Sequence, residues 1–179
     1  MKHKSKYSKS NDFEKSVSEF FNEHLIRDSK PIPKKILVSF SSGPDSVALT
    51  HILRSLYPNI ELVLCYFNHK LRPDETTEEI QFTSHIATLF GYTYIVVEEN
   101  IADLSVLKKT SIELTARQWR YSELKKIAKR HNINYVATGH HADDQIETFF
   151  AQFVRGAKSH WNGFKPVRKL DDDITLVRP

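Results

Sequence analysis

Residues 41–46, SSGPDS, combine the side chains and the spacing that binding a phosphate group requires. They follow the apolar run 36–40, which predicts a buried strand, and precede the helix-like run 47–53. A strand, a short loop and a helix in this order direct free backbone N–H groups to one place, where an anion binds favourably. Serine hydroxyls add donors, and the carboxylate of Asp45 is suited to holding Mg²⁺ beside the phosphate. The alternative is an ordinary turn between a strand and a helix.

Residues 140–148, HHADDQIET, form a second cluster that contains two histidines, two aspartates and a glutamate. Asp143 and Glu147 are four residues apart, so on a helix they share one face. Carboxylates in a first helical turn also suit the helix dipole. We expect this cluster to bind Mg²⁺ and a cationic substrate. Helix capping by Asp143 is one alternative, and a zinc site that includes His140 and His141 is another. Adjacent residues at a strand end point to opposite sides, which argues against one metal bound by both histidines.

Alternating strands and helices must position these two clusters. The apolar patterns predict strands at 36–40, 60–67, 93–97, 135–139 and 174–177, and helices at 46–56, 74–91, 111–131 and 142–155. This alternation predicts the α/β class, with a parallel, doubly wound sheet and helices on both faces. Ligands of such sheets bind beyond the carboxyl ends of the strands. The polar stretches that follow the first, second and fourth strands are therefore expected to converge on one crevice.

The excess of basic residues lies in the N-terminal segment. Residues 1–35 contain nine Lys or Arg and five Asp or Glu, whereas the rest contains 17 of each, and the net charge is +4. The charge pattern therefore does not indicate a general nucleic-acid-binding face. We expect a disordered basic tail at 1–10 and one domain at 11–179, which begins with a helix that Asn11 or Asp12 caps and that packs on the sheet.

Cys65 is the one cysteine in the 179 residues, which argues against an intrachain disulfide and against a metal or Fe–S site built on cysteines. No apolar run is long enough to cross a bilayer. We expect a cytoplasmic protein.

The 41–46 loop resembles the pyrophosphate loop, SGGxDS, of the N-type ATP pyrophosphatases, the PP-loop family, in which ATP is cleaved between its α- and β-phosphates. Ser41, Gly43, Asp45 and Ser46 match this pattern, whereas Ser42 stands where the family usually has its first glycine. A serine is unstrained there if its φ is negative and strained if its φ must be positive.

Three further stretches occur in the order typical of the tRNA(Ile)-lysidine synthetase family. Residues 68–72, NHKLR, are similar to a DHGLR-type loop, residues 113–121 fit E-x-x-A-R-x-x-R-Y, and residues 140–148 are followed by Arg-Gly at 155–156. In the second stretch, Glu113, Arg117 and Arg120 are expected to form one stripe of a helix. This stripe lies opposite an apolar face that includes Ile112 and Trp119 and is expected to point inward. The resemblance implies a Rossmann-like fold of the adenine-nucleotide alpha hydrolase type. Beyond Pro179 the family continues with C-terminal tRNA-binding domains, so we expect a fragment or a minimal version.

The resemblance implies a ligase that forms a C–N bond and releases AMP and pyrophosphate. ATP would adenylate the C2 carbonyl oxygen of the wobble cytidine of tRNA(Ile) with a CAU anticodon, and the ε-amine of lysine would displace AMP to give lysidine. ATP and Mg²⁺ are the implied cofactors, and tRNA(Ile) and free L-lysine are the implied partners. No membrane is involved, and a homodimer is left open.

The implied site residues fall into four groups. They are Asp45, Asp143, Asp144 and Glu147 for catalysis; Ser41, Ser42, Gly43, Pro44, Asp45, Ser46, His69, Arg117, Gly139 and His140 for ATP; Glu113, Arg120, Asp143 and Glu147 for lysine or tRNA; and Asp45 and Asp144 for Mg²⁺.

Two other functions stay open. The first is another PP-loop enzyme that modifies tRNA, although a tRNA thiolase typically needs paired cysteines and Cys65 stands alone. The second is a catalytically silent nucleotide-binding module, which the departures at Ser42 and Asn68 favour.

Overall fold

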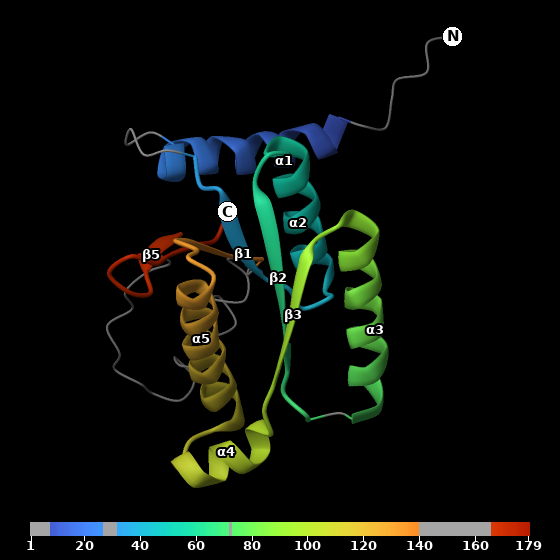
Figure 1. The fold of residues 1–179 in the computed structure, drawn as a ribbon, viewed down its shortest axis with the longest axis vertical. Helices are drawn as coiled ribbons and strands as arrows, with labels where there is room; N and C mark the ends of the chain where they lie inside the picture. The colour runs from blue at the N-terminus through green and yellow to red at the C-terminus, as the bar shows by residue number, and fades with distance from the viewer. Residues whose placement is uncertain (1–7, 27–31, 72, 140–165) are drawn as a thin grey trace.

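The computed structural model describes residues 8–26, 32–71, 73–139 and 166–179 (Figure 1). Six strands form one sheet in the order β3-β2-β1-β4-β6-β5. All neighbouring strands are parallel except β5 and β6, which are antiparallel. The strands are β1 (Lys35–Ser39), β2 (Glu61–Asn68), β3 (Thr93–Glu98), β4 (Tyr135–Thr138), β5 (Val167–Lys169) and β6 (Thr175–Val177). The predicted α/β class is confirmed, and β5 is the strand that the apolar pattern did not predict.

Helices cover both faces of this sheet. They are α1 (Ser8–Phe21), continued by the π-helical turn η1 (Asn22–Ile26), α2 (Pro44–Leu56), α3 (Pro73–Phe90), α4 (Ile101–Lys108) and α5 (Ile112–Arg130). Figure 1 shows α2 and α3 on one side of the sheet and α5 on the other. The chain runs from β1 outward to β2 and β3, and then returns to place β4 on the opposite side of β1. The strand order therefore reverses between β1 and β4, which is where sheets of this kind bind ligands.

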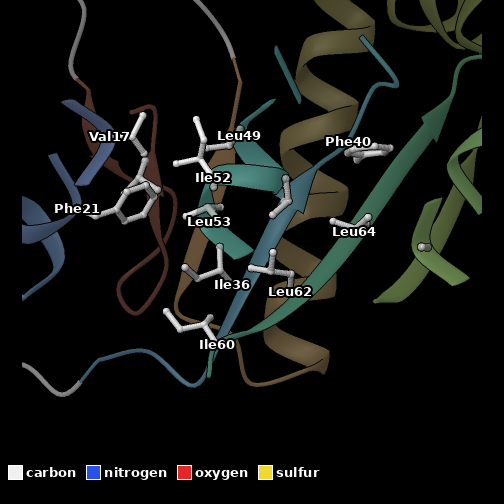
Figure 2. Packing of buried hydrophobic residues seen from close by; sticks show 14 residues of the cluster. Val17, Phe21, Ile36, Phe40, Leu49, Ile52, Leu53, Ile60, Leu62 and Leu64 are labelled. Carbon is white, nitrogen blue, oxygen red and sulfur yellow. The ribbon is translucent and has the colours of Figure 1, made fainter. Parts of the chain in front are cut away.

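The alternation of side chains along β1 explains the two-sided core. Ile36, Val38 and Phe40 join one buried cluster, with Leu49, Ile52 and Leu53 of α2 and with Val17 and Phe21 of α1 (Figure 2). Leu37 points the other way and joins Trp119, Leu124 and Ile127 of α5. Because successive side chains of a strand face opposite sides, a strand covered on both sides must be apolar throughout.

Three details differ from the sequence-based predictions. Helix α1 begins at Ser8, so neither Asn11 nor Asp12 caps it. Helix α4 was not predicted; it is capped by Asn100, whose side chain accepts a hydrogen bond from the backbone N–H of Asp103. Ile112, predicted to face inward, is 46% exposed because it lies in the first turn of α5, before the helix reaches the sheet.

The long helix α3 buries small side chains and leaves several of its larger apolar ones exposed. Thr83 and Ala87 are buried, whereas the larger Phe82, Leu89 and Phe90 are exposed. The predicted helix at 142–155 lies outside the described residues. Among the described helices, none is both long and apolar enough to cross a membrane.

Candidate nucleotide-binding site

The loop after β1 and the end of β4 meet where the strand order reverses. Ser39 pairs with Thr138, so Gly139 follows β4 level with the start of the loop. A Cβ atom on Gly139 would lie 3.0 Å from the backbone C and O of Asp45 and the backbone N of Ser46. Such contacts are tighter than nine in ten real Cβ contacts, and backbone atoms can move less than a flexible side chain, so the position favours glycine. The end of β4 therefore lies directly against the first turn of α2.

The side chain of Ser46 holds the loop in place. It is buried, and its Oγ donates to the carbonyl oxygen of Gly43 at 3.0 Å. The same Oγ accepts from the backbone N–H of Ser41 at 3.2 Å and from the Ser41 hydroxyl at 3.3 Å. These bonds join residues only three to five positions apart, so the loop conformation is determined locally.

The N-terminus of α2 suits a bound phosphate. Gly43 is the N-cap, with φ −64° and ψ 157°, and no side chain caps the helix. Pro44 is at the first helical position and has no N–H, and the first hydrogen bond within the helix runs from the N–H of Val47 to the oxygen of Gly43 at 3.2 Å. The N–H groups of Asp45 and Ser46 precede that bond, and the positive end of the helix favours an anion beside this turn. The residues present therefore fit the phosphates of a nucleotide.

Ser42 adopts the left-handed conformation, with φ 59°. Its hydroxyl donates to the carbonyl oxygen of Ser41 at 2.6 Å. A non-glycine residue in this region costs about 1–2 kcal/mol. Gly43 has a negative φ, and a Cβ there would lie 3.4 Å from the Ser41 Oγ, an ordinary contact. The position that calls for glycine is therefore the one that Ser42 occupies.

His69 is held in its neutral form at the carboxyl end of β2. Burial and, to a smaller extent, the nearby Arg120 guanidinium together lower its pKa to about 4. Arg120 Nη2 lies 3.3 Å from His69 Nε2, and the Trp119 ring packs edge-on at 5.3 Å between centroids. Since Nε2 accepts from Arg120, the proton is on Nδ1, which is buried and has no partner in the described residues.

The expected stripe on α5 is split by the fold. Glu113 and Arg117 are exposed, as predicted, but Arg120 turns into the protein toward His69. Burial lowers the pKa of the Arg120 guanidinium, as does the nearby positive charge of Arg117. The predicted stripe opposite the apolar face therefore does not hold at Arg120, because this residue lies at the edge of the packed face of the helix.

Asn68 has a structural role at the end of β2. Its side chain donates to Glu98 Oε1 at 2.8 Å and accepts from the backbone N–H of Lys70 at 2.9 Å. Lys70 has φ 53°, and its ammonium lies 3.2 Å from Glu98 Oε2. The hydrogen bond from Asn68 and the contact with Lys70 hold the pKa of the Glu98 carboxyl below its usual value. Asn68 therefore shapes the turn that presents His69.

Four of the predicted site residues, His140, Asp143, Asp144 and Glu147, lie outside the described residues. The predicted Mg²⁺ pair includes one of them. Within the described ranges, no three His, Cys, Asp or Glu side chains gather as a metal site would require. Asp45 is exposed on the first turn of α2, where its carboxylate remains the described candidate for the metal.

Two arginines of this region were missed by the sequence analysis. Arg168 is in β5 and Arg178 follows β6, and both contact Tyr121 of α5. Tyr121 is part of the E-x-x-A-R-x-x-R-Y pattern, but the two arginines that contact it come from a hairpin some 50 residues later in the sequence. Such a contact depends on strand register, which the apolar pattern of a three-residue strand does not specify.

Comparison with known proteins identifies the domain. Residues 9–179 match the family model of the PP-loop domain. The tRNA(Ile)-lysidine synthase of Bacillus cereus is 30% identical over 169 residues, which cover 93% of this chain and 35% of that protein. The bifunctional protein TilS/HprT of Listeria monocytogenes is 36% identical over 163 residues, which cover 89% of this chain and 24% of that protein. The chain thus spans about a third or less of the length of these relatives.

Solved structures share the fold at low sequence identity. The U34-tRNA thiolase NcsA of Methanococcus maripaludis superimposes with a TM-score of 0.70 at 18% identity, covering 94% of this chain and 59% of that one. The NH3-dependent NAD synthetase of Campylobacter jejuni gives a TM-score of 0.59 at 12% identity, covering 78% of this chain and 60% of that one. The switch-point loop, the glycine that lies against it and the match over residues 9–179 lead to one conclusion: the chain belongs to the PP-loop domain family and is homologous to the N-terminal part of the tRNA(Ile)-lysidine synthases.

Proposed function

We propose that this chain is the ATP-binding catalytic domain of a tRNA(Ile)-lysidine synthase. The observation that carries the proposal is the close approach of Gly139 to the first turn of α2, whose N-cap is a glycine, at the switch point of the sheet. Its similarity to lysidine synthases over 93% of its length supports tRNA as the substrate. The reaction takes place in the cytoplasm, and its partners are tRNA(Ile) and free L-lysine.

In the first step, the C2 carbonyl oxygen of the wobble cytidine attacks the α-phosphorus of ATP and pyrophosphate leaves. The backbone N–H groups of Asp45 and Ser46 stabilise the negative charge that develops on the pyrophosphate. The hydroxyls of Ser41 and Ser42 lie in the same loop and become donors to a phosphate when they exchange their bonds to Ser46 and to the Ser41 carbonyl. His69 and Arg117 contribute from the neighbouring elements. Asp45, with Asp144, would hold Mg²⁺, which when bound withdraws charge from the leaving phosphates.

In the second step, the lysine ε-amine attacks C2 of the adenylated cytidine, the C–N bond forms and AMP leaves with the oxygen. The ammonium of lysine must lose a proton before it can attack, and a carboxylate is the suitable base. We assign this role to Asp143, Asp144 and Glu147 as a group. Glu113 and Arg120 complete the lysine or tRNA side, with Arg120 acting through its bond to His69.

The test is pyrophosphate release from ATP and Mg²⁺ in the presence of lysine and unmodified tRNA(Ile), with incorporation of labelled lysine followed in parallel. Asp45→Ala should abolish both signals. Asp172→Ala, which removes an exposed carboxylate from the β5–β6 turn, is the matched control and should retain both. Release of pyrophosphate without lysine incorporation would favour a different PP-loop reaction on tRNA.

ATP binding with neither signal would favour the silent module, or a requirement for the part of the relatives that this chain does not span. Supplying that region of a relative in trans separates these two outcomes. The thiolase alternative has no support from the chain's cysteine, because Cys65 is buried in β2 and burial raises the pKa of its thiol.

A further inference from the structure

The β5–β6 hairpin brings two arginines to the face of the sheet that α5 covers. Arg168 pairs with Leu176 across the hairpin, and Arg178 is two residues beyond Leu176. Side chains directly opposite one another, or two residues apart along a strand, lie on the same face of a sheet. Leu176 is fully buried in the cluster under α5, so both guanidiniums are on that side.

Tyr121 of α5 contacts both guanidiniums. Arg178 Nη2 donates to the Tyr121 hydroxyl at 3.1 Å, and the Arg168 Cζ lies 4.5 Å from the centre of the Tyr121 ring. Arg117 is one helical turn before Tyr121 on α5. Burial alone would raise the pKa of the Tyr121 phenol, but the bond from Arg178 and the charges of Arg178, Arg168 and Arg117 bring it below its ordinary value. The phenol therefore lies in a strongly positive local field.

Two of the three arginines have no carboxylate partner among the described residues. Neither Arg117 nor Arg168 forms an ion pair with a carboxylate there, and the Nε of Arg168 is buried without a hydrogen-bond partner. Burial and the neighbouring arginines lower the pKa of the Arg168 guanidinium. A partly buried cation with an unsatisfied donor is costly unless an anion satisfies it. The arrangement is therefore suited to a ligand with several acceptor oxygens.

The cluster of Arg117, Arg168, Arg178 and Tyr121 borders the nucleotide site. Val177 pairs with Ala137, which pairs with Val38, so Arg178 is level with the end of β1 just before the phosphate loop. Two strand spacings separate β6 from β1, which corresponds to roughly 10 Å. Strand β5, with Arg168, lies one strand further out, at the edge of the sheet. The cluster thus extends from the carboxyl end of β6 toward the outermost strand β5, away from the loop.

We propose that the hairpin side of this cluster, Arg168 and Arg178, holds a backbone phosphate of the RNA substrate beside the nucleotide site that Arg117 serves. The planar guanidinium binds phosphate oxygens in a bidentate manner, which an ammonium cannot do. Tyr121 is a positioning residue that sets the directions of Arg168 and Arg178. The inference rests on the proposed function in one respect, namely that the substrate is a tRNA.

The experiment measures binding of a fluorescent anticodon stem-loop RNA with a CAU anticodon, by anisotropy, over a series of salt concentrations. Arg168→Gln should weaken binding roughly tenfold and lower the slope of log Kd against log salt by about one, as expected for the loss of one phosphate contact. Arg168→Lys should restore most of the salt slope but less of the RNA affinity, because the positive charge remains whereas the bidentate guanidinium is lost. ATP affinity, measured separately, should not change in either variant.

Arg130→Gln is the matched control, since it removes the same charge from the exposed last turn of α5. It should leave both the affinity and the slope unchanged. Arg168 is only half-buried, and thermal unfolding of Arg168→Gln without RNA should match the wild type, so a folding defect is recognised directly. Arg178 is 8% exposed and is therefore not the residue to replace first.

Three results would overturn the proposal. The first is an unchanged salt slope in Arg168→Gln, and the second is no RNA binding by the wild-type chain. The third is an Arg168→Gln variant that loses affinity for ATP or lysine but not for RNA. The last result would assign the cluster to an ATP phosphate or to the lysine carboxylate. Failure of the proposed function gives a different pattern, in which lysine is not incorporated although RNA binding still depends on Arg168.

Discussion

The two sides of the candidate site are held together in different ways. On the loop side, Ser46 binds Gly43 and Ser41, which are three and five residues away. On the α5 side, Arg120 reaches His69 across 51 positions and Arg178 reaches Tyr121 across 57. The loop can adopt its conformation from local chemistry, whereas the α5 side exists only when the sheet is complete. Perturbations within the loop should therefore act mainly on the ligand, whereas perturbations of contacts between distant segments should affect the fold as well.

The largest effect is expected at Gly139, where the end of β4 lies against the first turn of α2. Gly139→Ala would place a Cβ 3.0 Å from the backbone of Asp45 and Ser46 and push β4 away from α2. We expect a loss of about 1–3 kcal/mol in the free energy of unfolding, as for other overpacked sites, together with at least roughly tenfold weaker ATP binding, because the N–H groups are displaced. Denaturant unfolding and ATP titration measure the two effects.

Gly91→Ala is the matched control for this prediction. Gly91 has φ 67° with open space around its Cα, so alanine there meets strain but no clash. It should cost about 1 kcal/mol of stability and leave ATP affinity unchanged. Equal ATP affinity in Gly139→Ala and the wild type would mean that the loop does not depend on contact with β4.

The α5 side should be sensitive to acid through His69. Its pKa is about 4 in the folded chain and about 6.5 when unfolded, so the unfolded state binds the proton more tightly. Stability is fully present above pH 6.5 and is lost as the pH falls from there toward 4. Allowing for screening by water at a half-buried group, we expect a loss of about 1–2 kcal/mol across this window. His69→Gln should remove this part of the pH dependence in denaturant unfolding, whereas replacing the exposed His51 should not.

Tyr121→Phe tests the long-range bond alone. Removing the hydroxyl leaves the ring under Arg168 but takes away the acceptor at 3.1 Å from Arg178. We expect about 1 kcal/mol of destabilisation in thermal or chemical unfolding. Tyr92→Phe is the control, because the Tyr92 ring stacks on Phe90 and its hydroxyl has no hydrogen-bond partner among the described residues. A Tyr121→Phe chain as stable as the wild type would show that water replaces the bond at no cost.

The smallest effect is expected at Ser42, on the loop side. Ser42→Gly removes the left-handed strain at φ 59° but adds flexibility to the unfolded chain, so a net gain of about 0.5–1 kcal/mol is expected. Differential scanning calorimetry measures the change in Tm. A destabilised Ser42→Gly would mean that the hydroxyl bond to the Ser41 carbonyl contributes more than the backbone strain costs.

The same contrast separates what was predictable from what was not. The apolar runs around Leu37 and Val63 predicted buried parallel strands, and the structure confirms the α/β class. The SSGPDS loop predicted a phosphate site, and the uncapped end of α2 and the glycine at 139 fit that prediction. The carboxylate cluster at 140–148 lies outside the described residues and stays a prediction. Helix α4, strand β5 and the inward turn of Arg120 were not foreseen.

The sequence by itself determined the features that depend on neighbours in the chain: the periodicity of strands and helices, the cap of α5 by Ser111, and the self-bonded loop at 41–46. Tertiary structure alone decided which polar residues meet. The neutral His69, the buried Arg120 and the arginine pair around Tyr121 result from strand register and from the placement of α5 on one face. Local propensities are read within a few residues, whereas register and burial are properties of the whole sheet.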